Sequence, residues 1–340
     1  MLPDDEYERA TVTPELLELI RRRYGFVALA AEVDLGGAYN LNMLVAADGE
    51  EFVVRVYNTY VRPERLAAIQ HVRDHLRNRS WPVASVQLTT TGEGFCSLGP
   101  RLIELERFVQ SDGQMNSWPR LVVGLSTLGR LHTDLRECPA PAAAREPPLS
   151  NHVAADRVVE ETAPAIASIR GLGLTRDQAR CVDAAEQLAS ALLHASERLP
   201  FDLPAQLVHG DFWDNNVRFR GQRVVLIGDF DFMGFRARID DLALTLFFAN
   251  DSLGREDMSA TRLAQLRDLV DNYDQALTPP LNAEERAALP YAIARSPLCF
   301  VRDIAYQGRA ALGELTRLRG PEWEWALCVI ESPDWLGAFQ

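Results

Sequence analysis

A polar loop between two short apolar runs carries the residues of this sequence that could do chemistry. The loop follows Gln206–Val208 and supplies Asp211 and Asn216, and a second run, Val224–Ile227, leads to Asp229. Carboxylate and carboxamide oxygens suit a hard cation such as Mg²⁺, which takes one or two protein ligands and completes its shell with water and phosphate oxygens. A carboxylate left over can orient and deprotonate a hydroxyl group. Loops rich in Asp and Asn are also common as plain turns, so order and spacing decide between the two interpretations.

The charged residues exclude several reaction classes, because all 35 Lys or Arg residues of the chain are arginines. The 340 residues include 35 basic and 48 acidic side chains, which gives a formal net charge of −13. A chain without lysine cannot use Schiff-base or pyridoxal-phosphate chemistry, which needs an amine nucleophile, nor a Walker-A loop. A pI near 5.0 argues against a nucleic-acid-binding protein, since neutralising phosphates needs a basic face. The acidic surplus serves either solubility or recognition of a cationic substrate.

The remaining composition is that of a globular protein, with 47% hydrophobic and 24% charged residues. The five cysteines form no C-x-x-C pair, which is typical of reduced, buried thiols. The first residues lack the basic and apolar regions of a signal peptide, and no apolar stretch approaches the roughly 18 residues of a membrane span. We therefore expect a cytoplasmic protein with no membrane partner; its oligomeric state is not indicated.

The first third of the chain is predicted to be rich in β-strands. A helix is expected over residues 13–25, capped by Thr13, with another over residues 65–76. Apolar runs separated by turn residues predict the strands, which are expected over residues 26–35, 41–47, 52–57, 86–90, 95–98 and 102–109. This pattern predicts a small antiparallel lobe over residues 1–109.

The pattern becomes helical beyond residue 110. Helices are expected over residues 121–132, over residues 178–199 and from Asp240 onward. An Ala/Pro-rich loop over residues 139–148 is expected to be exposed, and the runs 206–208 and 224–227 are expected to form a small hairpin. The sequence therefore predicts an α+β protein whose larger, helical lobe spans residues 110–340.

The order of motifs points to a known family. His209-Gly210-Asp211 with Asn216, followed by an apolar strand that ends in Asp229-Phe230-Asp231, resembles the catalytic and metal-binding loops of protein-kinase-like phosphotransferases. With Asp241-Leu242-Ala243 and the segment Leu128–His132, the chain looks like a member of the aminoglycoside phosphotransferase and choline kinase family over residues 26 to 330. The resemblance implies a two-lobed protein-kinase-like fold.

The resemblance also implies roles for the loop residues. Asp211 would be the catalytic aspartate that accepts or aligns the proton of the substrate hydroxyl, and Asn216 and Asp229 would bind Mg²⁺ that bridges the nucleotide phosphates. This division suits phosphoryl transfer, which depends mainly on positioning and on neutralising the charge of the transferring group.

Other loop residues are expected to support this centre. His209 would pack the loop, and Asp241 would anchor the loop backbone through hydrogen bonds. Asp231 would be a supporting acid or a second metal ligand. For Trp213 and Asp214, contact with the substrate and stabilisation of the loop are equally good interpretations.

In the small lobe, a glycine pair lies where this family has its nucleotide-covering loop. Gly36 and Gly37, with Asn40, fall between the first two expected strands, and glycine lets backbone N–H groups approach phosphates. Arg55 takes the position that is a phosphate-pairing lysine in kinase-like folds. An arginine pointing inward from an apolar strand needs a partner, so Arg55 should meet either nucleotide phosphates or a carboxylate.

One helix departs from the family pattern, and one part of the nucleotide site depends on backbone groups that side chains do not reveal. The helix over residues 65–76 lacks the glutamate that normally pairs with the strand cation, and Gln70 or His71 lies near its place, with Glu64 upstream. The nucleobase would be held by backbone groups at the lobe junction, which we place at Glu106 and Phe108.

We therefore expect a Mg²⁺-dependent kinase that transfers the γ-phosphate of ATP or GTP to a hydroxyl of a small molecule. The resemblance leaves the acceptor open among aminoglycosides or other antibiotics, amino alcohols, homoserine-like compounds and sugars. The acceptor-binding residues are predicted to be Trp213, Asp214, Asp257 and Asp303. The alternative is a catalytically silent nucleotide- or ligand-binding pseudokinase, suggested by the missing helix glutamate and by arginine in place of lysine.

Overall fold

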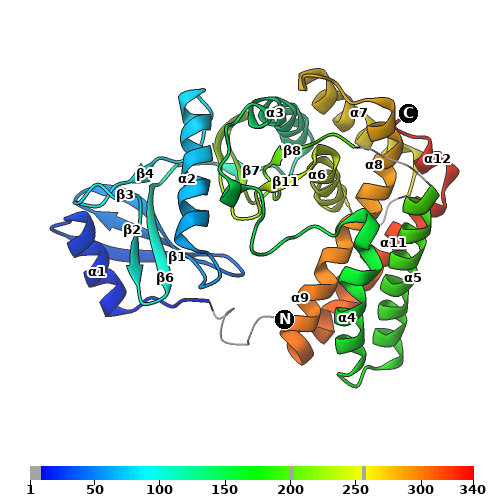
Figure 1. The fold of residues 1–340 in the computed structure, drawn as a ribbon, viewed down its shortest axis with the longest axis horizontal. Helices are drawn as coiled ribbons and strands as arrows, with labels where there is room; N and C mark the ends of the chain where they lie inside the picture. Colours follow the sequence, from blue (N-terminus) through cyan, green and yellow to red (C-terminus); the bar gives the residue numbers. More distant parts are fainter. Residues whose placement is uncertain (1–8, 199–202, 255–257) are drawn as a thin grey trace. The chain divides into compact units, whose positions relative to one another are not determined.

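The computed structural model describes residues 9–198, 203–254 and 258–340, and the chain forms two compact units. The first unit comprises residues up to Asp112, together with 139–148 and 225–228, and the second comprises 113–138, 149–224 and 229–340. The first unit is built on an antiparallel sheet and the second is mainly helical (Figure 1). The predicted α+β class is therefore confirmed. No helix in the described ranges is long and apolar enough to cross a membrane.

The sheet of the first unit joins neighbours that are antiparallel throughout. Its strands are β1 (Leu29–Gly36), β2 (Leu41–Ala47), β3 (Glu50–Val56), β4 (Val86–Gln87), β5 (Cys96–Leu98) and β6 (Arg101–Arg107). The order is β1-β2-β3-β6-β4, with β5 also paired to β6. Arg55 of β3 lies opposite Asn42 on one side and Glu104 on the other. Directly opposed residues share a face of the sheet, so this register puts these polar side chains on one face.

Two helices accompany the sheet, α1 (Pro14–Tyr24) and α2 (Pro63–Asn78). Thr13 caps α1 by accepting the backbone N–H of Leu16 at 3.2 Å, and Gly25 ends it with φ of 75°. Leu16 and Ile20 are buried in one core with strand residues such as Val54. The predicted helix over residues 13–25 is thus confirmed, cap included.

The loop over residues 139–148 belongs to the first unit, and its expected exposure is only partly correct. A short 3₁₀ turn, η2 (Ala142–Ala144), buries Ala144 completely. The Arg65 side chain of α2 donates to the carbonyl oxygens of Ala143 and Ala144 at 3.0 and 2.9 Å. An alanine side chain is small enough to enter this contact, a fit that composition alone does not reveal.

The second unit is dominated by helices. They are α3 (Trp118–Arg136), α4 (Val158–Arg170), α5 (Arg176–Arg198), α6 (Arg238–Ser252), α7 (Ala260–Ala276), α8 (Ala283–Arg295), α9 (Phe300–Gln307), α10 (Leu312–Glu314), α11 (Gly320–Glu331) and α12 (Pro333–Leu336). Short turns η3 (Ala155–Arg157), η4 (Ser296–Cys299), η5 (Gly308–Ala311) and η6 (Leu315–Arg319) connect some of them. Helix α5 packs against both α4 and α11, and α4 also packs against α9 (Figure 1).

Short strands lie among these helices, and their pairing corrects one prediction. They are β7 (Gly113–Gln114), β8 (Ala205–Val208), β9 (Val217–Arg220), β10 (Arg223–Ile227) and β11 (Gly234–Ala237). The expected hairpin of 206–208 with 224–227 is wrong, because β8 pairs with β11, Val208 lying opposite Gly234. The turn at Gly221 (φ 61°) separates β10 from β9 instead, and the short alternating run Val217–Arg220 was too weak a strand signal to anticipate this.

Candidate active site

The polar loop of residues 209–216, which we call the 209–216 loop, starts where β8 ends and stops where β9 begins. Gly210 has a φ of 83°, and a side chain there would collide with the carbonyl oxygen of Phe232. Asp229 also adopts a left-handed conformation, with a φ of 62°, which is uncommon for a residue with a side chain. Backbone of this kind is held by its surroundings and gathers at functional sites.

The carboxylate of Asp241, at the start of α6, holds the 209–216 loop in place. Its Oδ2 accepts the backbone N–H of His209 at 3.0 Å, and its Oδ1 accepts that of Gly210 at 3.1 Å. The Asp241 side chain is fully buried. Burial opposes its charge, but the hydrogen bond from His132 and the positive charge of Arg236 act against burial, and the net effect lowers its pKa. The anchoring geometry expected for Asp241 is therefore present.

The imidazole of His132 connects Asp241 to α7. His132 Nε2 lies 3.0 Å from Asp241 Oδ2, and Nδ1 lies 2.7 Å from the hydroxyl of Tyr273. Burial raises the pKa of Tyr273 well above its usual value, so the phenol stays protonated and donates a hydrogen bond to Nδ1. Nε2 then carries the hydrogen that Asp241 accepts. This assignment follows from the partners, as it must for any histidine tautomer.

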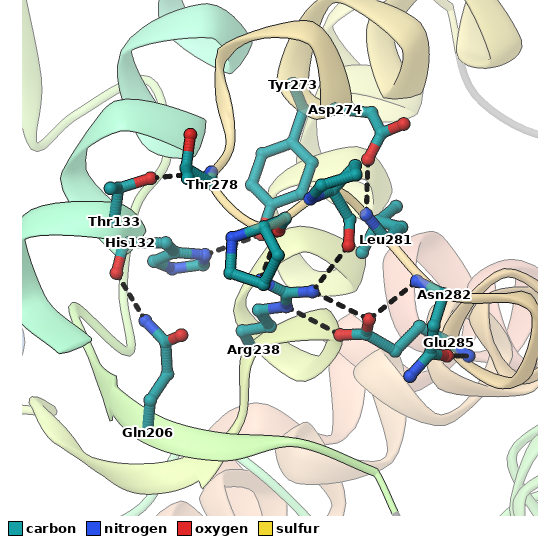
Figure 2. A network of polar contacts seen from close by, with 12 residues as sticks. His132, Thr133, Gln206, Arg238, Tyr273, Asp274, Thr278, Leu281, Asn282 and Glu285 are labelled. Carbon is teal, nitrogen blue, oxygen red and sulfur yellow. Dashed lines mark hydrogen bonds and ion pairs between the residues drawn. The ribbon is translucent and has the colours of Figure 1, made fainter.

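A buried ion pair closes the same network, as Figure 2 shows. Arg238 donates to both carboxylate oxygens of Glu285 at 2.6 and 2.7 Å, and the two side chains are 3% and 0% exposed. Arg238 also donates to the carbonyl oxygens of Pro279 and Pro280, and Asn282 caps α8 reciprocally with Glu285. The start of α6, which carries Asp241, is thereby fixed to the α7–α8 connection.

Three side chains donate to the carboxylate of Asp211. Asn151 Nδ2 lies 2.8 Å from Oδ1, while Asn216 Nδ2 and Trp213 Nε1 lie 2.7 and 3.3 Å from Oδ2. The backbone N–H of Asp211 in turn donates to His209 Nδ1 at 3.2 Å, and His209 packs against Phe230 with ring centroids 4.5 Å apart. Asp211 is thus oriented from both its side chain and its backbone. Asn151 was missed in the sequence, since nothing in its local pattern marks it.

Burial raises the pKa of Asp211 to about 8, and the negative charge of nearby Asp229 acts in the same direction. The hydrogen bonds from Asn216 and Trp213 lower this pKa but do not offset the other two effects. Two carboxylates that repel each other are stabilised in their charged forms by a cation between or beside them. The electrostatics of this loop therefore suit a bound cation.

The side-chain oxygens near Asp211 fit a Mg²⁺ ion that takes most of its ligands from substrate phosphates and water. In the described part of the chain, no three His, Cys, Asp or Glu side chains gather into a metal site. Asn216 turns its amide nitrogen to Asp211, which leaves its oxygen to serve a metal, and Asp229 offers a carboxylate. One or two protein oxygens supplemented by phosphates and water are what Mg²⁺ accepts.

The predicted acceptor residues fall in different places. Trp213 stacks on Phe248 with ring centroids 4.4 Å apart. One carboxylate oxygen of Asp214 is buried without a hydrogen-bond partner, and burial, with the charge of Asp251 adding to it, raises the pKa of Asp214. Asp303 lies on α9, whereas Asp257 lies outside the described residues.

Asp231, predicted as a supporting acid, lies in the turn that follows Asp229.

The predicted glycine loop lies in the first unit. Gly36 and Gly37 have φ values of 86° and 122°, and Asn42 donates to the Gly36 carbonyl oxygen at 2.9 Å. Asn40, 7% exposed, accepts the backbone N–H of Asn58 at 2.9 Å. Asn40 therefore ties the end of this loop to the rest of the unit.

The ion pair between helix and sheet has its charges placed opposite to the kinase-like arrangement: the helix carries the cation and the strand carries the carboxylates. No glutamate fills the expected place near Gln70 and His71; helix α2 instead carries Arg73, whose guanidinium lies 2.7 Å from Glu104 and 2.8 Å from Glu106. Gln70, one of the residues near the expected place, donates to Glu104 at 2.5 Å. Arg55 lies 5.8 Å from the ring centre of Tyr57, and its charge acts on Glu106.

This cluster contains more buried acid than one arginine neutralises. Burial opposes the charge of Glu104, but Arg73 and the hydrogen bonds around Glu104 lower its pKa. For Glu106, burial raises the pKa and the charge of Glu104 adds to the rise, against Arg73 and Arg55. The backbone N–H of Phe108 donates to the backbone carbonyl oxygen of Glu51 at 3.1 Å. The Glu106 side chain therefore belongs to an ion cluster that the sequence did not reveal.

The chain matches the phosphotransferase enzyme family over residues 31–294. It is 25% identical to a homoserine kinase of Zymomonas mobilis over 79% of this chain and 78% of that one. Among solved structures, a microcompartment-associated aminopropanol kinase has a TM-score of 0.70 at 18% identity, with 95% of this chain and 99% of the other covered. An amicoumacin kinase solved with AMP-PNP and Ca²⁺ has a TM-score of 0.65 at 14% identity, with 90% and 92% covered. These structural likenesses establish the kinase-like fold.

Proposed function

The chain belongs to the phosphotransferase enzyme family, and on that premise we propose that it transfers the γ-phosphate of ATP to a hydroxyl group of a small molecule. The observation that carries the proposal is the carboxylate of Asp211, which three side chains orient beside Asn216 and Asp229. In the reaction, the acceptor oxygen forms a bond to the γ-phosphorus, the bond to the bridging oxygen of ADP breaks, and the hydroxyl proton passes to Asp211.

Asp211 is suited to this role by its fixed orientation and its burial. Its pKa of about 8 lies near neutral pH, the range in which a general base combines sufficient basicity with a useful unprotonated fraction. The hydrogen bonds from Asn151 and Asn216 leave the carboxylate little freedom to rotate, so a hydroxyl held beside it meets a correctly aimed oxygen.

Asn216 and Asp229 are the residues that would hold Mg²⁺. When bound, Mg²⁺ neutralises charge on the nucleotide phosphates during transfer. On the nucleotide side we assign Gly36, Gly37 and Arg55 to the phosphates, with Asn42 shaping the glycine turn.

We assign the nucleobase to the backbone at Glu106 and Phe108. Asn40 supports the glycine loop through Asn58. ATP is the first choice of nucleotide because a solved relative of this fold holds an ATP analogue, and GTP is the second.

For the acceptor we propose a small hydroxy compound that carries an amine, with homoserine as the first candidate. A relative over most of the chain is a homoserine kinase, and a structure of similar fold is an aminopropanol kinase. Trp213, Asp214 and Asp303 are assigned to the acceptor side. The silent pseudokinase finds no support, because the family is one of enzymes and the chain retains the Asp, Asn and Asp of its loops.

The experiment is ADP release measured with ATP, Mg²⁺ and a panel of alcohols, with Asp211→Asn as the control. Asparagine has nearly the same shape as aspartate but cannot take up the proton. We expect at least one acceptor to raise ADP release in the wild type about 100-fold or more above the variant. If no alcohol in the panel raises it above the variant, the chain is not an alcohol kinase.

A further inference from the structure

A small cavity lies beside the 209–216 loop, within the second unit. Its volume is about 10 Å³, which is room for about one water-sized group. The charged side chains that line it are Arg236, Asp240, Asp241 and Arg295, and Asn151, His152 and Ser296 add polar groups. Gly210, the neighbour of the proposed base Asp211, lines it too. The cavity therefore has room for one oxygen or nitrogen atom of a ligand whose reacting hydroxyl is at Asp211.

Arg236 differs from Arg295, which also lines this cavity, and from Arg302, which contacts the backbone of His152. Arg236 Nη2 donates to the carbonyl oxygen of Phe232 at 2.7 Å, and in the described part of the chain no carboxylate lies within ion-pair distance of it. Arg295, by contrast, pairs with Asp240 at 2.5 Å. Arg302 donates to two backbone carbonyl oxygens. A guanidinium has five N–H donors, so most of the donors of Arg236 remain for a ligand.

The carboxylates nearest to Arg236 are already engaged by other groups. Asp241 accepts from His132 and from two backbone N–H groups, and Asp240 pairs with Arg295. Asp211 accepts from three side chains. Burial lowers the pKa of Arg236 although all three carboxylates act in the opposite direction. The guanidinium therefore loses hydration that the protein does not fully replace, and an anionic ligand would replace it.

Asn151 places a hydrogen-bond acceptor at the same cavity. Its Nδ2 donates to Asp211, while its Oδ1 is buried without a hydrogen-bond partner. Leaving an amide oxygen buried without a hydrogen bond is unfavourable, so a donor on the ligand would be stabilised there. One ligand therefore meets a cation at Arg236 and an acceptor at Asn151, beside the proposed base.

We propose that Arg236 binds the carboxylate of the acceptor and that Asn151 Oδ1 accepts a hydrogen bond from its ammonium group, so that the substrate class is a hydroxy amino acid. This inference rests on the proposed function, whose hydroxyl chemistry takes place at Asp211. A carboxylate beside a guanidinium forms charge-assisted hydrogen bonds, which are the strong ones. An amino alcohol without a carboxylate would leave Arg236 unsatisfied. The other anion that could reach Arg236 is the transferring phosphate.

The test compares L-homoserine with 3-aminopropan-1-ol, which has the same chain, amine and hydroxyl but no carboxylate. In the wild type we expect kcat/KM to favour L-homoserine about 10- to 100-fold, the effect of one or two charge-assisted hydrogen bonds. In Arg236→Gln the ratio of the two kcat/KM values should fall to about threefold or less, because the KM for L-homoserine rises. Any loss with 3-aminopropan-1-ol should be much smaller than the loss with L-homoserine.

Two further variants complete the test. Arg236→Lys keeps the charge and retains an intermediate preference, since lysine cannot match the planar fork. Arg180→Gln removes an arginine that is 71% exposed on α5 and leaves the preference as in the wild type. Calorimetric binding of L-homoserine without nucleotide is lost in Arg236→Gln while the melting temperature stays within about 3 °C, which separates a lost contact from a misfolded chain.

Each other outcome overturns the inference. If Arg236→Gln lowers kcat/KM for both acceptors equally, Arg236 acts on the phosphoryl group instead. If the wild type phosphorylates alcohols but no hydroxy amino acid, or shows no preference for the carboxylate, the substrate class is wrong while the proposed function stands. If no alcohol is phosphorylated above the Asp211→Asn background, the proposed function fails and the inference with it.

Discussion

Asn151 Nδ2 donates to Oδ1 of Asp211 across 2.8 Å, although 60 residues separate the two in the chain. The other oxygen of the carboxylate is held by residues of the 209–216 loop itself. The orientation of Asp211 therefore depends on a segment outside the sequence motif. This dependence can be tested without touching the motif.

Replacing Asn151 with Ala removes one of the three donors to Asp211 and should lower kcat about tenfold, with a smaller effect on the KM for ATP. Steady-state kinetics with the best acceptor measures both constants. Asn272→Ala is the matched control, because the Asn272 amide donates to the Asp268 carbonyl at an exposed position on α7. A wild-type kcat in Asn151→Ala would show that the 209–216 loop orients Asp211 unaided.

Replacing Arg55 with Gln should raise the KM for ATP about tenfold, lower kcat, or do both, with the fold retained, because a charged phosphate contact is lost. Arg55→Lys should restore most of the loss, since a lysine also carries the charge. Nucleotide titrations of the three proteins give the constants. Unchanged kinetics in Arg55→Gln would mean that Arg55 serves only the ion cluster around Glu106.

Replacing Glu285 with Gln leaves the buried guanidinium of Arg238 without its charged partner. Breaking a buried ion pair on one side typically costs about 3 to 5 kcal/mol, so the free energy of unfolding should fall by about that amount in urea titrations. Asp183→Asn removes a partner of Arg170 at a site where the two side chains are 50% and 39% exposed. Its effect should stay within about 1 kcal/mol, and equal losses in the two variants would contradict the account of the network in Figure 2.

The imidazole of His152 gives the stability of the protein a defined pH dependence. Burial lowers its pKa from 6.5 to about 3, and the charges of Arg236, Arg295 and Arg302 act in the same direction, against Asp240. The unfolded chain takes up this proton near pH 6.5 and the folded chain only near pH 3. The contribution of His152 to stability is therefore complete above pH 6.5 and is lost as the pH falls toward 3.

His152→Gln should accordingly flatten the dependence of the unfolding free energy on pH in that window. Because the side chain is still 21% exposed, the effect will be smaller than that of a fully enclosed ring. Urea titrations at pH 7.5 and pH 5 compare the variant with the wild type. Parallel pH profiles would show that His152 takes up its proton equally in both states.

How far the sequence predicts this site depends on whether a residue lies in a continuous motif. The helix α1 was predictable with both ends, because Thr13 and Gly25 are local signals. Asp211, Asn216 and Asp229 were singled out by the resemblance to a known family; the structure places Asn216 beside Asp211, and the charge of Asp229 acts on Asp211. The pairing of β8 with β11 was not predictable, because a four-residue strand carries too little pattern to choose its partner.

Residues that act through distant contacts could not be recognised. Asn151 and Arg236 meet at one cavity from segments with no motif. The ion cluster of Arg73 with Glu104 and Glu106 inverts the expected polarity: the helix supplies the cation and the strand the carboxylates. A search that assumed a helix glutamate could not find it, since the two arrangements satisfy the same buried charges.

Phosphorus NMR of the reaction mixture is the most direct test of phosphoryl transfer to an alcohol with Asp211 as the base. With ATP, Mg²⁺ and L-homoserine, we expect ADP and a new phosphate monoester signal in the wild type. Asp211→Asn should give neither, at an unchanged melting temperature. A monoester formed at the same rate by Asp211→Asn would show that Asp211 is not the base.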